Sequence, residues 1–280
     1  MPDSNPPSTP PRVALVGFGE AGATFACSPQ WRGDTRAWDV LPDRRAAMAE
    51  CGVATGENAA AALADRAFLL SLVTADAALE AARAYAPLLP EGALWCDMNS
   101  VSPQTKREAA AAIEAAGGRY VDVAVMAPVK PAALGVPLLV SGPHAIAAQP
   151  LLAALGFSNI RIVGDQVGRA SAIKMIRSVM VKGLEALSWE CAAAAEAAGV
   201  FDEVMASLDA SEKQVGWAER VAYNRERMAT HGARRAAEME ESARTLLGLG
   251  IEPVMTRGTV QLQREAAKGT KTSKEGNEGA

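Results

Sequence analysis

Residues 13–22 read VALVGFGEAG, an apolar run that continues directly into three glycines with the spacing G-x-G-x-x-G. A short apolar run bounded by glycine indicates a buried strand. Gly17 permits a tight turn, Gly19 lets a pyrophosphate approach the backbone, and Gly22 lets the next helix pack closely on the sheet. The start of that helix directs N–H groups and the positive end of its dipole at a phosphate. The stretch therefore predicts a dinucleotide-binding loop formed by Gly17, Phe18, Gly19, Glu20, Ala21 and Gly22.

A second strand is predicted at residues 35–40, TRAWDV, with Asp39 near its end. Asp39 follows Gly19 by 20 residues, the distance at which a carboxylate binds the ribose hydroxyls of NAD. The same carboxylate repels a 2′-phosphate. Arg44 and Arg45 follow within a turn, however, and suit a 2′-phosphate. The sequence favours NAD as the cofactor and leaves NADP as the alternative.

Composition excludes several classes of protein. The chain has 280 residues, 49% of them hydrophobic, and a net charge of −4, so it has no general attraction for nucleic acid or for an anionic membrane. It contains no membrane-spanning apolar run and no basic-then-apolar leader. Four cysteines without a C-x-x-C pair, and two histidines, predict neither a metal site nor a disulfide framework, which fits the cytoplasm. Residues 1–11 and 268–280 are expected to be disordered.

Strand and helix patterns alternate as far as residue 164. Strands are predicted at 67–73, 93–97, 119–125, 137–141 and 160–163, and helices begin at 21, 42, 76 and 103. This order indicates an α/β fold with a Rossmann-like, doubly wound, mostly parallel sheet, which forms a dinucleotide-binding domain over 12–164. Ligands bind beyond the carboxyl ends of such strands. We place the cofactor there against Val73, Thr74 and Asn99, and the substrate against Ser100 and Met126.

Strand patterns stop after Gly168, and a smaller all-α domain is predicted over 165–267. A long helix at 171–198 enters it, with an apolar stripe at Ile173, Ile176, Met180, Leu184, Leu187 and Cys191. Further helices are expected at 202–207, 211–230, 233–249 and 256–267. His231, which precedes Gly232, is interpreted as a cap or turn residue between two of them.

The long helix carries a candidate catalytic residue, Lys174. Arg177 and Ser178 follow at spacings of three and four, which place all three side chains on one face. An enzyme that transfers hydride to or from an alcohol carbon needs a group that exchanges the hydroxyl proton. A lysine serves when burial lowers its pKa toward neutrality.

These motifs resemble the β-hydroxyacid dehydrogenase family, which includes 3-hydroxyisobutyrate and 6-phosphogluconate dehydrogenases. The resemblance covers residues 12–255 and rests on GFGEAG (17–22), DMNSVSP (97–103), the region 122–135 and GRASAIK (168–174). It implies that Lys174 is the family's acid/base lysine. It also implies a homodimer of two-domain subunits, with the active site between the domains.

The chain departs from the family pattern where substrate is held. Ser178 replaces an asparagine, Asn99 replaces a serine, Pro128 interrupts a loop of backbone donors, and Ala237-Glu238 replaces a lysine-aspartate pair. Since proline has no N–H, this chain must bind an anionic substrate through other groups than the backbone donors that the family uses. Arginine binds carboxylate or phosphate with two parallel hydrogen bonds. We therefore assign the small anionic substrate to Arg177 and Ser178, with help from Arg234 or Arg235.

Three functions are compatible with these motifs. The first is an NAD(P)-dependent oxidoreductase that acts on a hydroxyacid. The second is an imine-reducing relative, a class that usually replaces the catalytic lysine, so Lys174 speaks against it. The third is a non-catalytic dinucleotide-binding protein, which only the altered substrate loop supports. The glycine loop, Asp39 and Lys174 together favour the first function.

Overall fold

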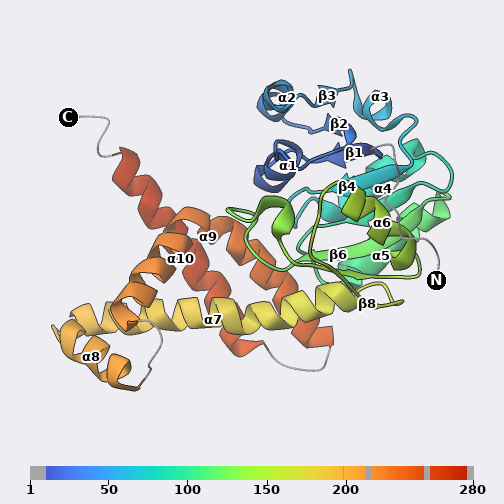
Figure 1. Ribbon diagram of the computed structural model, residues 1–280. Helices are drawn as coiled ribbons and strands as arrows, with labels where there is room; N and C mark the ends of the chain where they lie inside the picture. The colour runs from blue at the N-terminus through green and yellow to red at the C-terminus, as the bar shows by residue number, and fades with distance from the viewer. Residues whose placement is uncertain (1–10, 198, 212–215, 249–252, 276–280) are drawn as a thin grey trace. The chain divides into compact units, whose positions relative to one another are not determined.

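The structure is a computed structural model that describes residues 11–197, 199–211, 216–248 and 253–275. It contains two compact units, one ending at Lys174 and one beginning at Met175. The first unit is built on one eight-stranded sheet of order β3-β2-β1-β4-β5-β6-β7-β8 (Figure 1). The strands are β1 (Arg12–Val16), β2 (Asp34–Trp38), β3 (Ala54–Thr55), β4 (Phe68–Ser71), β5 (Leu94–Asp97), β6 (Arg119–Val125), β7 (Leu138–Ser141) and β8 (Ile160–Gly164).

All neighbouring strands are parallel except β6 and β7. The doubly wound, mostly parallel sheet is therefore confirmed. The order reverses between β1 and β4, where the chain leaves the two strands toward opposite edges of the sheet. A ligand crevice forms at such a point, beyond the carboxyl ends of the strands.

Helices cover both faces of this sheet. Along β1, Val13 and Leu15 enter the core that contains Phe25, whereas Ala14 and Val16 enter the opposite core. Strands buried on both sides read as continuous apolar runs, which is why they are visible in the sequence. The covering helices are α1 (Glu20–Ala26), α2 (Pro42–Met48), α3 (Ala59–Leu63), α4 (Ala78–Tyr85), α5 (Pro103–Ala115) and α6 (Ala145–Ala154), with short 3-10 turns at η1 (Ala49–Cys51), η2 (Ala86–Leu88) and η3 (Ala133–Gly135).

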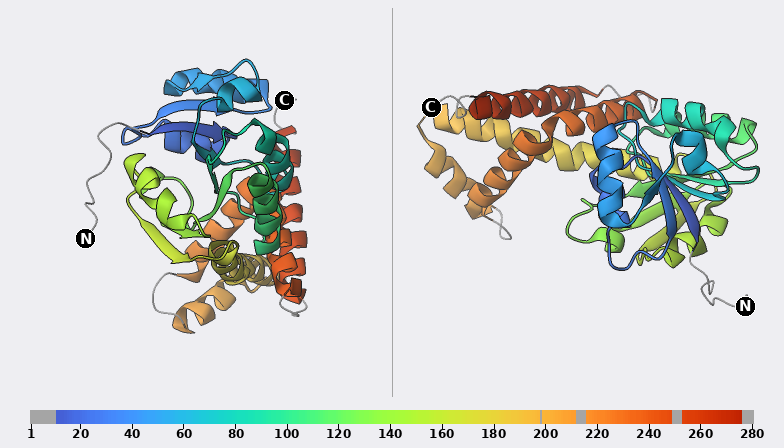
Figure 2. Two further views of the ribbon diagram at one scale, coloured as in Figure 1. Left: turned by 90° about the vertical axis from the view of Figure 1, so that its right-hand side faces the viewer. Right: turned by 90° about the horizontal axis from the view of Figure 1, so that it is seen from above.

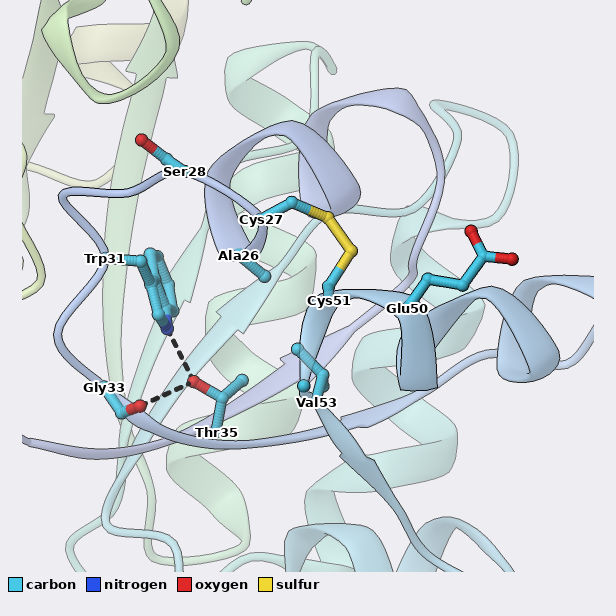
Figure 3. A pocket seen from close by; sticks show the side chains of 10 residues that line it. Ala26, Cys27, Ser28, Trp31, Gly33, Thr35, Glu50, Cys51 and Val53 are labelled. Carbon is cyan, nitrogen blue, oxygen red and sulfur yellow. Dashed lines mark hydrogen bonds between the residues drawn. A yellow bond between two sulfur atoms is a disulfide. The ribbon is translucent and has the colours of Figure 1, made fainter.

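One expectation about the cysteines is wrong. Cys27, which ends α1, and Cys51, which ends η1, form a disulfide with their Cα atoms 4.8 Å apart. The fold brings them together although 24 residues separate them. The disulfide borders a cavity of about 400 Å³, in which Trp31 donates from Nε1 to Thr35 Oγ1 at 2.6 Å (Figure 3). None of the predicted site residues lines this cavity.

The second unit is helical. It contains the greater part of α7 (Arg169–Ala197), and α8 (Phe201–Ser211), α9 (Trp217–Gly248) and α10 (Val254–Glu275). α9 and α10 lie side by side (Figure 2). Within the described ranges, no helix combines the length and apolar character needed to cross a membrane.

Two predictions about these helices need correction. The turn expected at His231-Gly232 is absent, because α9 continues through both residues. Gly232 instead permits close packing, since a Cβ there would overlap the backbone oxygen of Gln263 on α10. α10 also continues to Glu275, past the end predicted at residue 267 and into the expected disordered tail. Residues 1–10 and 276–280, also expected to be disordered, lie outside the described ranges.

The apolar stripe predicted on α7 is not buried along its length. Ile173 is half-buried, and the side chains of Leu187 and Cys191 lie outside the described residues. Ile176, Met180 and Leu184 of the stripe are 49%, 65% and 43% exposed. The opposite side carries buried polar side chains, among them Lys182 and Glu185. The interior of the helical unit is therefore partly ionic, and an apolar row of side chains faces outward.

Candidate active site

The glycine loop joins β1 to α1 at the point where the strand order reverses. Gly17 has a φ of +93°, and a Cβ there would lie 2.6 Å from the backbone oxygen of Leu72. A Cβ on Gly22 would lie 2.6 Å from the backbone oxygen of Gly17. Both positions therefore need glycine. The tight turn and the close helix packing predicted here are confirmed.

The middle of this loop is open. Apart from Gly19 itself and its two chain neighbours, no atom of the described residues lies within 4 Å of the position that a Cβ on Gly19 would take. α1 then begins at Glu20 and Ala21 without a side-chain cap. N–H groups in the first turn of a helix have no partner within the helix and suit an anion. The loop thus fits the pyrophosphate of a dinucleotide.

Asp39 contacts this loop, as its separation of 20 residues from Gly19 in the sequence predicts. Its Oδ2 accepts from the N–H of Phe18 at 2.7 Å, and its Oδ1 accepts from the N–H of Leu41 at 2.9 Å. The side chain is half-buried, so the carboxylate holds the end of β2 to the loop.

The two arginines that suit a 2′-phosphate differ in their surroundings. Arg45 donates to the backbone oxygens of Asp39 at 2.7 Å and Val40 at 3.0 Å, and its guanidinium lies 4.9 Å from the Trp38 ring. The guanidinium of Arg45 is therefore already engaged in hydrogen bonds to backbone oxygens. Arg44 is exposed and is the better placed of the two for a 2′-phosphate.

Other predicted residues lie where the neighbouring strands end. Val73 and Thr74 follow β4, and Val73 packs beside the position of a Gly17 Cβ. Asn99 follows β5 and donates from Nδ2 to Ser71 Oγ at 2.9 Å, while its buried Oδ1 accepts no hydrogen bond among the described residues. A buried acceptor of this kind fits a donor on a bound molecule. Asn99 thus joins the loop as a residue that would hold the cofactor.

Lys174 reaches the same edge of the sheet from the second turn of α7. It is half-buried, and its Nζ donates to Ser100 Oγ at the end of β5. Met126, at the end of β6, packs on the same small apolar cluster as Ile173. The structure therefore brings Lys174, Ser100 and Met126 to the edge where the sequence places them.

A network of buried charged residues, formed by Lys106, Asp97 and Asp122, lies close to these residues in the sheet unit. Lys106 of α5 donates to Asp97 at both the backbone oxygen, at 2.6 Å, and Oδ1, at 2.8 Å. Tyr120 donates from its hydroxyl to Asp97 Oδ2 at 2.6 Å. Burial, and then the Asp97 and Asp122 charges, raise the pKa of Tyr120 well above its usual value. Tyr120 therefore stays protonated and acts as a donor.

Asp122 of β6 holds the start of α7. Its Oδ2 accepts from the N–H groups of Gly168 at 3.1 Å and Ser171 at 3.0 Å, and from Ser141 Oγ at 3.1 Å. Its Oδ1 accepts from Ser171 Oγ at 2.5 Å and lies 3.4 Å from Lys106 Nζ. A carboxylate at a helix start satisfies N–H groups and suits the helix dipole.

Sequence reasoning missed Lys106 as part of this region. A usable signal was present, because Lys106 shares the spacing of the buried residues Ala109, Ala110 and Ile113 on α5. A lysine at such an inward position needs a buried anionic partner. Those partners, Asp97 and Asp122, lie on β5 and β6, so the sequence pattern of α5 alone does not show them.

The remaining predicted substrate residues belong to the helical unit. Arg177 is exposed on α7 and Ser178 is buried. Arg234 is 58% exposed, with Nε 4.0 Å from Glu238. Arg235 is buried and paired with Glu185, and burial lowers its pKa against the effect of that partner. The assignment of Arg235 to substrate is therefore wrong, because its guanidinium is already committed inside the unit.

Two parts of the chain match known family models. Residues 12–164 match the NAD binding domain of 6-phosphogluconate dehydrogenase, and residues 195–266 match a domain of unknown function (DUF1932). An uncharacterized 28.5 kDa protein of Methanothermus fervidus is 26% identical over 255 residues, covering 89% of this chain and 96% of that protein.

Solved structures show the same fold. A conserved hypothetical protein from Sinorhizobium meliloti is 37% identical with a TM-score of 0.72, over 93% of this chain and 90% of that one. A 3-hydroxyisobutyrate dehydrogenase from Mycobacterium tuberculosis is 18% identical with a TM-score of 0.74, over 93% of this chain and 94% of that one. Because the NAD-binding match spans more than half of the chain, including the glycine loop, the resemblance seen in the sequence is confirmed. The chain belongs to the β-hydroxyacid dehydrogenase family, whose nucleotide-binding domain takes a nicotinamide dinucleotide.

Proposed function

We propose that this protein transfers hydride between a nicotinamide dinucleotide and the hydroxyl-bearing carbon of a small anionic hydroxyacid. One observation carries the proposal. Lys174, from the start of α7, donates to Ser100 at the carboxyl edge of the sheet that also carries the open glycine loop. A proton-exchanging amine and a dinucleotide cradle on one strand edge are the two parts that this reaction needs.

The residues divide the work as follows. The bound dinucleotide would supply or accept the hydride. Lys174 exchanges the proton of the substrate hydroxyl, and the hydrogen bond with Ser100 fixes where its amine lies. The loop from Gly17 to Gly22 binds the pyrophosphate. Asp39 binds the adenosine ribose and favours NAD, because its carboxylate repels a 2′-phosphate.

The grip on the substrate anion is assigned to Arg177 and Ser178, which follow Lys174 on α7. The loop after β6 contains Pro128, which has no N–H to donate. Arginine supplies the paired donors that a carboxylate or phosphate requires. Met126 adds an apolar wall at the end of β6.

A homodimer is part of the same proposal. Ile176, Met180 and Leu184 form an exposed row at four-residue spacing on α7. Such a row on one helix face is typical of a surface that packs on another chain. We therefore assign this row to contact with a second copy.

Substitution of Lys174 tests the catalytic claim. Lys174→Ala is expected to lower kcat by about 10²- to 10⁴-fold, because general acid–base catalysis contributes about that much. Lys174→Arg keeps the charge but cannot exchange the proton, so it should be equally impaired. Lys268→Ala removes an exposed lysine of α10 and serves as the matched control.

Added methylamine distinguishes a catalytic amine from a structural one. It should restore part of the turnover of Lys174→Ala in proportion to the concentration of free amine. Turnover of hydroxyacids that survives Lys174→Ala at the wild-type rate would remove Lys174 from the mechanism. Unchanged NADH binding with no turnover of any hydroxyacid would instead favour the non-catalytic alternative.

A further inference from the structure

Lys106 is a buried cation that the proposed hydride transfer does not use. It lies on the inner face of α5 and is 0% exposed. Its ammonium bridges Asp97 Oδ1 at 2.8 Å and Asp122 Oδ1 at 3.4 Å. Asp97 and Asp122 are direct partners across the parallel strands β5 and β6. Lys106 therefore holds together two adjacent buried carboxylates that would otherwise repel each other.

Each of these carboxylates holds the backbone close to one member of the hydrogen-bonded pair formed by Lys174 and Ser100. On one side, Asp97 Oδ1 accepts from the N–H of Asn99 at 2.9 Å, and Ser100 is the next residue. On the other side, Asp122 holds Ser171 through both its N–H and its hydroxyl, and Lys174 lies three residues further along α7.

The contacts close into a ring. It runs from Lys106 through Asp97 to Ser100, across the hydrogen bond to Lys174, back along the first turns of α7 to Asp122, and so to Lys106. Removing Lys106 breaks the ring at the ammonium that joins Asp97 to Asp122.

We propose that Lys106 is a positioning residue that fixes the Lys174 amine against Ser100 by joining the two strands that carry its supports. The inference rests on the proposed function, since it concerns the placement of that catalytic amine. Lys106 itself touches neither substrate nor cofactor in this scheme. A displacement of about 1 Å in a catalytic group costs about 10²-fold in rate, so the loss of the bridge affects kcat.

The test compares Lys106→Met with Lys106→Arg, and with Arg66→Met as matched control. Arg66 is another buried cation of the same unit, and it pairs with Asp34 at 3.1 Å. Amine-specific labelling, mapped by mass spectrometry, reports the accessibility of Lys174, with the exposed Lys130 as internal reference. Kinetics report kcat, and a titration of NADH reports cofactor binding.

For Lys106→Met, the labelling of Lys174 relative to Lys130 should rise. Its kcat should fall by about 10²-fold. The Kd for NADH should change by much less than kcat, because Lys106 reaches only Asn99 of the proposed cofactor residues, through Asp97, and contacts neither the glycine loop nor Asp39. Lys106→Arg should recover part of kcat, since it retains the charge. Arg66→Met should lose stability without changing the labelling of Lys174.

Folded Lys106→Met with unchanged Lys174 labelling and unchanged kcat would overturn the proposal. So would equal changes in Arg66→Met, because they would show a general loss of stability. If Lys106→Met does not fold, Ser171→Ala removes the hydroxyl bond to Asp122 Oδ1 and weakens the contact that holds the start of α7, while the N–H bond to Oδ2 remains. The labelling of Lys174 should then rise by less than in a folded Lys106 variant, and no rise at all would overturn the proposal. Absence of turnover in wild type would count against the proposed function, whereas the labelling tests the positioning role separately.

Discussion

Arg234 and Arg235 are adjacent in the sequence and are unlike in the structure. Arg234 is 58% exposed, whereas Arg235 has 3% of its side chain exposed and pairs with Glu185. Glu185 also accepts from Gln263 Nε2 at 3.2 Å. Arg227 lies further away, at 4.0 Å from Glu185. A buried carboxylate that loses its nearest cation keeps most of the cost of its burial.

Arg235→Met is therefore expected to lower the free energy of unfolding by about 3 kcal/mol. Arg234→Met should change it by less than about 1 kcal/mol, as is typical of exposed ion pairs. Denaturant unfolding of the two variants and wild type measures both values. Equal effects would contradict the assignment of Arg235 to the interior of the helical unit.

At the residue scale, the sequence identifies the groups that local motifs determine. Gly17 and Asp39 lie where the sequence places them, because each stands at a fixed place in a strand-turn-helix pattern. Lys174 stays a prediction, made from its place after Gly168 and from the family resemblance. Lys106 and Asp122 are not assigned, because their roles depend on neighbours from other elements. Arg235 is misassigned for the same reason, since Glu185 lies 50 positions earlier in the sequence.

At the element scale, strands are predicted better than helices. The central strands read as apolar runs because both of their faces are buried. β3, α3 and α6 escape detection, since β3 has two residues, α3 has five, and α6 is almost uniformly apolar, with Pro150 inside it. In the helical unit, a glycine that signals a turn instead permits close packing of α9 and α10.

The outward apolar row of α7 gives a prediction at this scale. Wild type is expected to be a dimer by light scattering at micromolar concentration. Replacing Ile176, Met180 and Leu184 together by serine should produce a monomer, since the apolar area available for burial is lost. Tyr223→Ser, which changes an exposed apolar residue of α9, should remain dimeric. A monomeric wild type would contradict the dimer.

On the scale of the whole molecule, the proposed cofactor site and the proposed proton-exchanging amine belong to one unit. The glycine loop, Asp39, the strand ends and Lys174 all lie at or before the boundary at Lys174. The proposed substrate residues Arg177 and Ser178 lie after it. The first unit alone therefore contains every residue that we assign to the cofactor. The proposed reaction depends on cofactor binding, so cofactor binding is the property to test first.

The most direct measurement is a thermal-shift titration with NAD and NADP, each oxidised and reduced. A ligand that binds only the folded state adds about 2.7 kcal/mol of stability at a hundred times its Kd. NADH should raise the Tm of wild type, and of Arg44→Ala, by several degrees, and that rise should be lost in Asp39→Ala. NADPH alone raising the Tm would contradict the role of Asp39, and no rise with any of the four would contradict the nicotinamide site itself.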